Sequence, residues 1–202
     1  DATEEADKIR LCKEEFNAAA QTFSKALAGE LEKVVRVASK MMKSIFEGIL
    51  STRGPQGGIS FDKSDDDFEM QPILNSLPHS LTGPLEIVVS ICTQHLSDVN
   101  KETVLKMLID ACCDRIEQFV GQQSFRFSGA LKFEECVRAV TSMFGKFSSN
   151  SVRTRFSRIR EVMMVLTSDG SSSVEAASMT FSDSLTQLTT TEAQAILSLR
   201  ED

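Results

Sequence analysis

The apolar positions of this 202-residue chain recur at steps of three and four, the period of an amphipathic α-helix. The longest such pattern runs through the first 50 residues without a proline: Ile9, Cys12, Phe16, Ala20, Phe23, Leu27, Leu31, Val34, Ala38, Met41, Ile45 and Ile49. At a rise of about 1.5 Å per residue, these ~40 residues predict a rod of roughly 60 Å. A helix with one apolar seam and charged other faces needs partner helices, from this chain or from another.

A loop and a domain boundary follow the rod. Residues 53–58 are rich in glycine with one proline, and an acidic run ends at Asp65, Asp66 and Asp67. Such turn formers and clustered charges predict a solvated linker. The glycines do not form a phosphate-binding loop because no Gly-Lys-Ser/Thr follows them, and the aspartates lack the spacing of a calcium-binding loop.

The pattern after the linker predicts further helices. Pro72, Pro78 and Pro84 are expected to divide the next twenty residues into short pieces, with a helix starting after Pro84. Asn100 is expected to cap a longer helix that reaches Phe119 and is buried on more than one side. Residues 124–127 then turn the chain into the next helix, which runs to Phe144.

The clearest single stripe belongs to one helix expected over residues 152–166. Its apolar members are Val152, Phe156, Ile159, Met163 and Leu166. The stripe is flanked by Arg155 and Arg158 on one side and by Arg153 and Arg160 on the other. A serine-rich stretch at 170–184 ends this pattern.

The last helix is expected to begin near Thr189. Glu192 lies three residues further on, which is the spacing of a capping box. Strand alternation is not evident anywhere in the chain. The sequence therefore predicts an all-α protein, an elongated stack of helical bundles with a long first helix and a C-terminal multi-helix bundle.

Composition narrows the classes of function. A net charge of -7 argues against nucleic acid as a partner. Five cysteines without a CxxC pair are expected to be reduced core residues, and two histidines without a motif argue against a zinc site or a nucleophilic centre. We therefore expect no metal, no cofactor and no catalytic residue.

No apolar run reaches a membrane-spanning length and the start has no signal-peptide pattern, so we expect a soluble cytoplasmic chain. The missing initial Met and the abrupt end predict a fragment of a longer protein.

Three motifs in the last ~75 residues, in this order, resemble the C-terminal end of subunit 4 of the conserved oligomeric Golgi complex. The first motif is the entry to a helix and consists of Gly129, Leu131, Phe133 and Glu134. The second is an Arg-x-x-Phe-x-Arg helix with Arg153, Phe156 and Arg158. The third is a closing segment that starts with Leu-Thr-x-x-Glu and contains Leu188, Thr189, Glu192, Leu197, Leu199, Arg200 and Asp202. The chain departs from the family where a tryptophan-bearing stretch usually precedes the last helix, since it contains no Trp.

The resemblance implies a subunit fragment without catalysis in a vesicle-tethering complex of retrograde intra-Golgi transport. It implies a place on the Golgi membrane, peripheral on the cytosolic face, and partners among the other tether subunits, with SNAREs and Rab GTPases as further candidates. It also implies that residues 1–67 end a preceding helical-rod bundle and its acidic linker, and that residues 68–202 form the C-terminal bundle. The alternative is a helical membrane-surface or regulatory binding module unrelated to tethering.

Two sets of residues are the candidate sites. Arg158 and Glu192 belong to two of the matched motifs, and we expect them to pair and to hold the last helix on the arginine-rich one, unless Glu192 serves only its own capping box. Arg153, Arg155 and Arg160 form a possible interaction strip for an acidic helix or anionic lipid, or otherwise a solvated face.

Overall fold

A computed structural model describes residues 2–50, 72–147, 150–168 and 185–201, which are almost entirely helical. The helices are α1 (Ala2–Leu50), α3 (Pro72–Thr93), α4 (Asp98–Val120), α5 (Phe127–Gly145), α6 (Asn150–Arg155), α7 (Ser157–Leu166) and α9 (Thr190–Leu197). The predicted all-α class is confirmed. The acidic linker and the serine-rich stretch at 170–184 lie outside the described residues.

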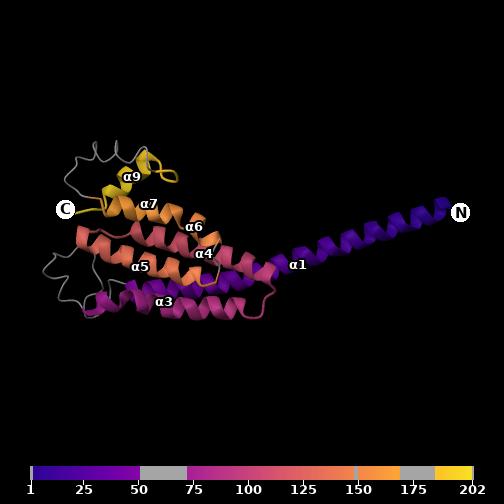
Figure 1. The fold of residues 1–202 in the computed structure, drawn as a ribbon, viewed down its shortest axis with the longest axis horizontal. Coiled ribbons are helices and arrows are strands. Elements are labelled where there is room, and N and C mark those ends of the chain that lie inside the picture. Colours follow the sequence, from indigo (N-terminus) through magenta and orange to yellow (C-terminus); the bar gives the residue numbers. More distant parts are fainter. Residues whose placement is uncertain (1, 51–71, 148–149, 169–184, 202) are drawn as a thin grey trace.

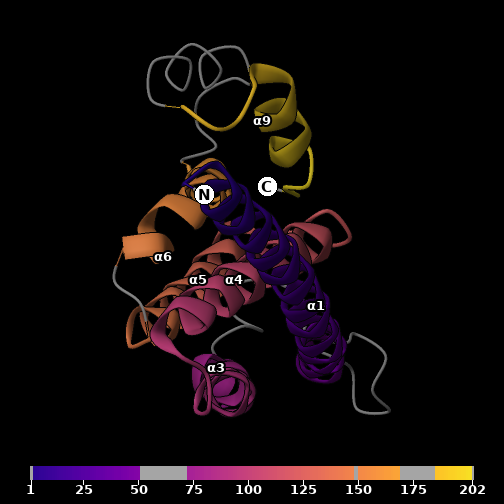
Figure 2. The same ribbon diagram turned by 90° about the vertical axis from the view of Figure 1, so that its right-hand side faces the viewer.

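The helices stack in layers along a rod (Figure 1). Helices α1 and α3 pack side by side, α4 and α5 cover them, α6 and α7 follow, and α9 packs chiefly against α7. The view along the long axis in Figure 2 shows the same order from α3 to α9. One continuous hydrophobic core runs from α1 to Ala193 of α9.

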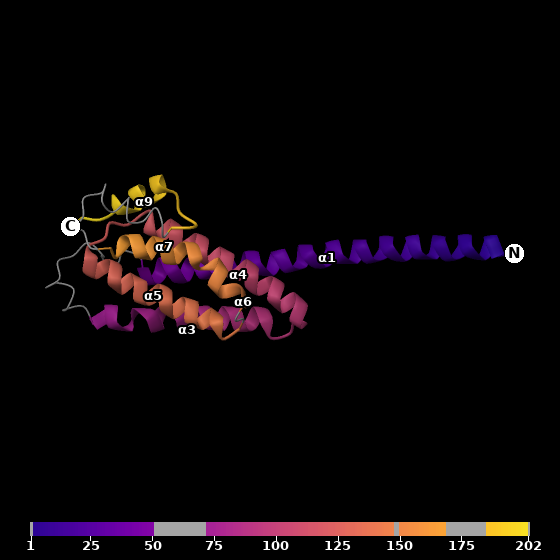
Figure 3. The same ribbon diagram turned by 45° about the horizontal axis from the view of Figure 1, so that its top comes forward.

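Helix α1 confirms the predicted rod, but only its second half joins the bundle. Its first half projects beyond the other helices (Figures 1 and 3), and Phe16 and Phe23 there are 74% and 70% exposed. In the second half the buried residues are Leu31, Val35, Ala38, Met42 and Phe46. The predicted seam through Val34 and Met41 is therefore wrong for this half, because α1 is apolar on two faces there and periodicity does not reveal which face meets the core.

The expectation that prolines divide residues 72–93 is also wrong. Pro78 and Pro84 both lie inside α3. A proline in a helix interior costs about 3 kcal/mol because it removes one hydrogen bond and crowds the preceding turn. Here Pro84 lies on the exposed face, while one uninterrupted face buries leucines and valines on both sides of it: Leu77, Leu81, Leu85, Val88 and Val89. Burial of these side chains offsets the proline cost.

Two helix boundaries differ from the sequence prediction. Helix α4 begins at Asp98 with Ser97, not Asn100, as its N-cap residue, and an aspartate in the first turn suits the positive end of the helix dipole. The single helix expected over residues 152–166 is interrupted at Phe156, whose φ and ψ are −83° and 2°. The apolar stripe is nevertheless buried throughout, and the Phe156 ring packs 6.1 Å from that of Phe144.

The cysteine prediction holds for three of the five residues. Cys112, Cys113 and Cys136 are buried and free, and Cys92 is half-buried. Cys12 is exposed on the projecting part of α1, so its assignment to a core was wrong. Within the described residues, none of the helices has the length and apolar character needed to cross a bilayer.

Candidate functional site

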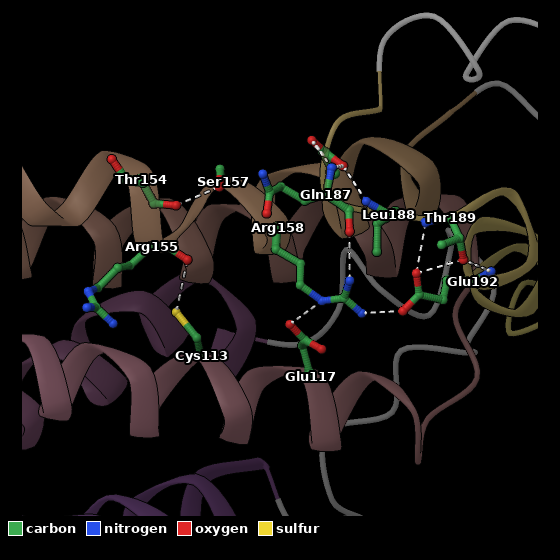
Figure 4. A network of polar contacts seen from close by, with 11 residues as sticks. Cys113, Glu117, Thr154, Arg155, Ser157, Arg158, Gln187, Leu188, Thr189 and Glu192 are labelled. Carbon is green, nitrogen blue, oxygen red and sulfur yellow. Dashed lines mark hydrogen bonds and ion pairs between the residues drawn. The ribbon is translucent and has the colours of Figure 1, made fainter.

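Arg158 lies at the start of α7 and points across to two other parts of the bundle (Figure 4). Its Nε donates to Glu117 Oε1 of α4 at 3.0 Å. Its Nη1 donates to the carbonyl of Gln187 at 2.9 Å, and its Nη2 donates to Glu192 Oε1 of α9 at 2.8 Å. The structure thus brings Arg158 and Glu192 together and adds two partners from distant segments. We call the contacts of Arg158 with Glu117, Gln187 and Glu192 the arginine lock.

Glu192 serves the lock and its own helix at the same time. Its Oε2 accepts hydrogen bonds from the backbone N–H and the hydroxyl of Thr189, each at 2.8 Å. The Glu192 N–H donates back to the Thr189 hydroxyl at 3.3 Å, which completes the predicted capping box. Pairing with Arg158 and capping are therefore not alternatives, because the two carboxylate oxygens divide the two roles.

A second carboxylate of α7 holds the segment that leads into α9. Glu161 accepts the backbone N–H groups of Thr186, Gln187 and Leu188 at 2.9 to 3.2 Å, as well as the Thr186 hydroxyl at 2.8 Å. One carboxylate thereby fixes three successive peptide groups. This orients the Gln187 carbonyl toward Arg158, which lies one helical turn earlier in α7.

The charges at the site stabilise one another. The hydrogen bond from Arg158, followed by those from Thr189, lowers the pKa of Glu192 from 4.5 to about 2. The hydrogen bond to Glu192 in turn raises the pKa of Arg158, against the opposing effect of burial. At Glu161, partial burial alone would raise the pKa, but the donors of residues 186–188 outweigh it and lower the pKa. Both carboxylates are therefore ionised at neutral pH.

The C-terminal end of α9 is attached separately. The Phe125 N–H donates to the Leu199 carbonyl at 2.8 Å, and the Glu201 N–H donates to the Phe125 carbonyl at 3.0 Å, as in a short parallel β-bridge. The Arg200 guanidinium lies 5.8 Å from the centre of the Phe127 ring and donates to the Ser168 carbonyl. Residues 185–201 are thus held at both ends, by the arginine lock and by this bridge.

Of the other arginines near Arg158, the structure describes the side chains of Arg155 and Arg160. Arg155, the last residue of α6, pairs with Asp110 of α4. Arg160 is exposed on α7, and the side chain of Arg153 lies outside what the structure describes. The interaction strip of Arg153, Arg155 and Arg160 stays a prediction, which flotation with anionic and neutral vesicles would test.

The lock joins elements that are close only in the folded chain. It borders a pocket of about 300 Å³ between α4, α7 and α9, lined by Val120, Val162 and Leu199 beside the charged groups. Nε, Nη1 and Nη2 of Arg158 each donate to a protein group on these elements. In the part of the chain that the structure describes, no three His, Cys, Asp or Glu residues gather as a metal site would require.

Sequence reasoning did not find Glu117, Gln187 or Glu161 as members of the site. Glu117 is 41 residues and Gln187 is 29 residues from Arg158. No local spacing links such positions, and a backbone carbonyl carries no signal in its side chain. Glu117 also shares its face of α4 with Asp110 and Asp114, so its charge alone does not single it out.

Comparison with known proteins gives a consistent result over nearly the whole chain. The sequence model of the family described as "Conserved oligomeric Golgi complex subunit 4, C-terminal" matches residues 2–196. Conserved oligomeric Golgi complex subunit 4 of Dictyostelium discoideum is 25% identical over 200 residues, covering 97% of this chain and 21% of the relative. The protein of the same name from Arabidopsis thaliana is 20% identical over 160 residues, 79% of this chain and 21% of the relative. The chain thus spans about a fifth of the length of these curated relatives.

Proposed function

The chain belongs to the family of the C-terminal region of conserved oligomeric Golgi complex subunit 4, and from this premise we propose that it is a non-enzymatic part of a vesicle-tethering complex in retrograde intra-Golgi transport. The match of the family model to residues 2–196 carries the proposal. It acts by protein–protein interaction. Its partners are the other subunits of the tether, with SNAREs and Rab GTPases as further partners, and it lies on the cytosolic face of the Golgi membrane as a peripheral component.

The arginine lock has a structural role in this function. It fixes α9 against α7 and α4 and so determines the surface that the C-terminal end presents to partners. Such a role fits half-exposed charges that are paired within the chain, because their contribution to stability is modest while their geometry is specific.

The long first helix connects two bundles in this proposal. The proposed division places the end of a preceding bundle and its linker in residues 1–67 and the terminal bundle in residues 68–202, with the second half of α1 shared between the two. The exposed Phe16 and Phe23 support packing of the first half of α1 in the preceding bundle. The second half, from Leu31 to Phe46, packs in the terminal core and would make the junction stiff.

Affinity purification of the full-length parent from its own cells, followed by mass spectrometry, tests the function. We expect the other tether subunits to copurify. Arg158→Ala is expected to reduce this recovery at unchanged amounts of the parent, whereas Val99→Ala, a change at an exposed residue far from the lock, is expected to leave it intact. If the tether subunits were absent from the purified material although the cells express them, the proposal would be overturned.

A further inference from the structure

Helix α1 passes from the core of the bundle into open space within about two turns. Leu31, 8% exposed, is the first buried residue in the described part of α1, whereas Phe23 is 70% exposed. Between these two residues the helix continues without interruption into its projecting half (Figure 3). Packing in the terminal core stiffens α1 from Leu31 to Phe46, and this support ends where the projection starts.

A glycine occupies this transition. Gly29 lies in the interior of α1, where glycine is less favourable than alanine because its backbone loses more conformational freedom on folding. No close contact requires a glycine there, since an added Cβ would meet no heavy atom of the described residues within 4 Å. The ion pairs that the structure gives for α1 each join residues on the same side of this turn, as Lys33 does with Glu30.

The face on which Gly29 lies excludes a role in helix packing. At about 100° per residue, Gly29 shares the charged face of α1 with Lys25 and Arg36. The buried residues from Leu31 to Phe46, and the exposed Phe16 of the projecting half, point at least about 100° away from it. A glycine that lets two helices approach closely would lie on one of those apolar faces. The consequence of a glycine at this position is therefore backbone flexibility.

We propose that α1 bends at Gly29, as a hinge between the terminal bundle and the part of the parent protein that packs on the projecting half. Hinges are a few residues, often small, at the end of a supported element, where they absorb a change in backbone dihedrals. Bending there changes the direction in which the terminal bundle, with α9 at the end opposite the projection, faces its partners (Figure 1). The inference rests on the proposed function only for the presence of an upstream bundle.

Distances between two nitroxide labels on the full-length parent test the hinge by electron paramagnetic resonance. The labels are attached to a noncanonical amino acid at Glu14 and Val99, which are exposed and lie on opposite sides of Gly29, so that native cysteines stay unlabelled. We expect a broad distribution of distances in the parent and a narrower one in Gly29→Ala. Alanine removes the extra backbone freedom and fits without a clash.

Gly48→Ala is the matched control. Gly48 also lies in α1 with free space around an added Cβ, but beyond the packed half, so its substitution should leave the distribution broad. Lys25→Gly combined with Gly29→Ala returns a glycine to the same face one turn earlier and should restore the broad distribution. Hydrogen exchange gives a second measure. The amides of residues 30–33, whose helical acceptors are the carbonyls of residues 26–29, should exchange about two- to fivefold more slowly in Gly29→Ala.

Two results would overturn the hinge. A distribution in the parent as narrow as that in Gly29→Ala would show that α1 is as rigid with glycine as with alanine. Equal narrowing by Gly48→Ala would assign the effect to helix propensity along the whole of α1. Copurification of the tether subunits is measured separately: if the subunits copurify while the distributions are equal, the proposed function stands and the hinge falls, and the reverse result has the opposite meaning.

Discussion

The arginine lock makes a quantitative prediction for Arg158→Ala. The substitution removes hydrogen bonds to Glu117, to the Gln187 carbonyl and to Glu192. The Arg158 side chain is 35% exposed, so water screens these contacts and each contributes about 0.5 to 1 kcal/mol. We therefore expect a loss of about 2 kcal/mol. If the whole chain unfolded as one unit, the melting temperature would fall by roughly 4 to 8 °C.

The loss should be concentrated in residues 185–201, because α9 packs chiefly against α7 and has Ala193 as its one fully buried residue. Hydrogen exchange with mass spectrometry measures this directly. At about 2 kcal/mol, the amides of α9 are expected to exchange roughly 30-fold faster, with those of α4 and α5 nearly unchanged.

Two variants serve as controls for this experiment. Arg158→Lys keeps the charge but not the forked geometry and should give an intermediate effect. Arg155→Ala breaks the pair with Asp110 and should affect α6 without affecting α9. If the amides of α9 exchanged at the same rate in Arg158→Ala as in the wild-type chain, the reasoning would be refuted. Helix α9 would then be held by its apolar contacts and by the bridge at Phe125 alone.

Four further predictions follow from the same contacts. The pKa of Glu192 is lowered to about 2 in the folded chain, so its stabilising effect is complete above pH 4.5 and is lost as the pH falls toward 2. The protection of the α9 amides relative to their intrinsic exchange rate at each pH should therefore fall over that range, and less so in Glu192→Gln. Glu161→Gln keeps one acceptor oxygen but loses the charge that holds three N–H groups, so residues 186–188 should exchange faster while α4 does not. Burial raises the pKa of Cys113 and Cys136 to about 12, so a thiol reagent at neutral pH should modify the buried cysteines only after denaturation. The same reagent should modify the exposed Cys12 quickly and the half-buried Cys92 more slowly, and Cys12→Ser should abolish the fast phase of the reaction. Phe156→Ala empties a fully buried site beside Phe144 and should cost about 3 to 5 kcal/mol in chemical denaturation, against less than about 0.5 kcal/mol for Val99→Ala.

Local features of the fold could be predicted from the sequence because their causes are local. The Thr189 and Glu192 capping box needs only residues three apart, and the stripe from Val152 to Leu166 needs only the helical period. The prolines of α3 were misjudged because the burial that offsets them comes from packing against α1 and α5, which the sequence of α3 does not contain. The buried face of α1 was misjudged for the same reason.

The arginine lock shows where prediction from sequence ends. The pair of Arg158 and Glu192 was expected because both belong to motifs of the family that the chain resembles, and not because of any spacing between them. The orientation of the guanidinium depends on Glu117 and on a peptide group that Glu161 fixes, and both relations exist only after folding. For a contact of this kind, the sequence can predict which two residues pair but not how their side chains are oriented.

The arginine lock and the core should fail in different ways when they are substituted. Phe156 contributes mainly apolar burial to the shared core, so its loss lowers the stability of the whole bundle and should reduce the amount of the protein in cells. Arg158 contributes little burial but sets the position of α9 through bonds to three groups, one on α4 and two in residues 185–201. Its loss should leave most of the protein folded and present, with α9 displaced. If Arg158→Ala lowered copurification of partners only in proportion to the amount of protein, the lock would matter for stability alone. A larger fall than the amount explains would locate a partner surface at α9 itself.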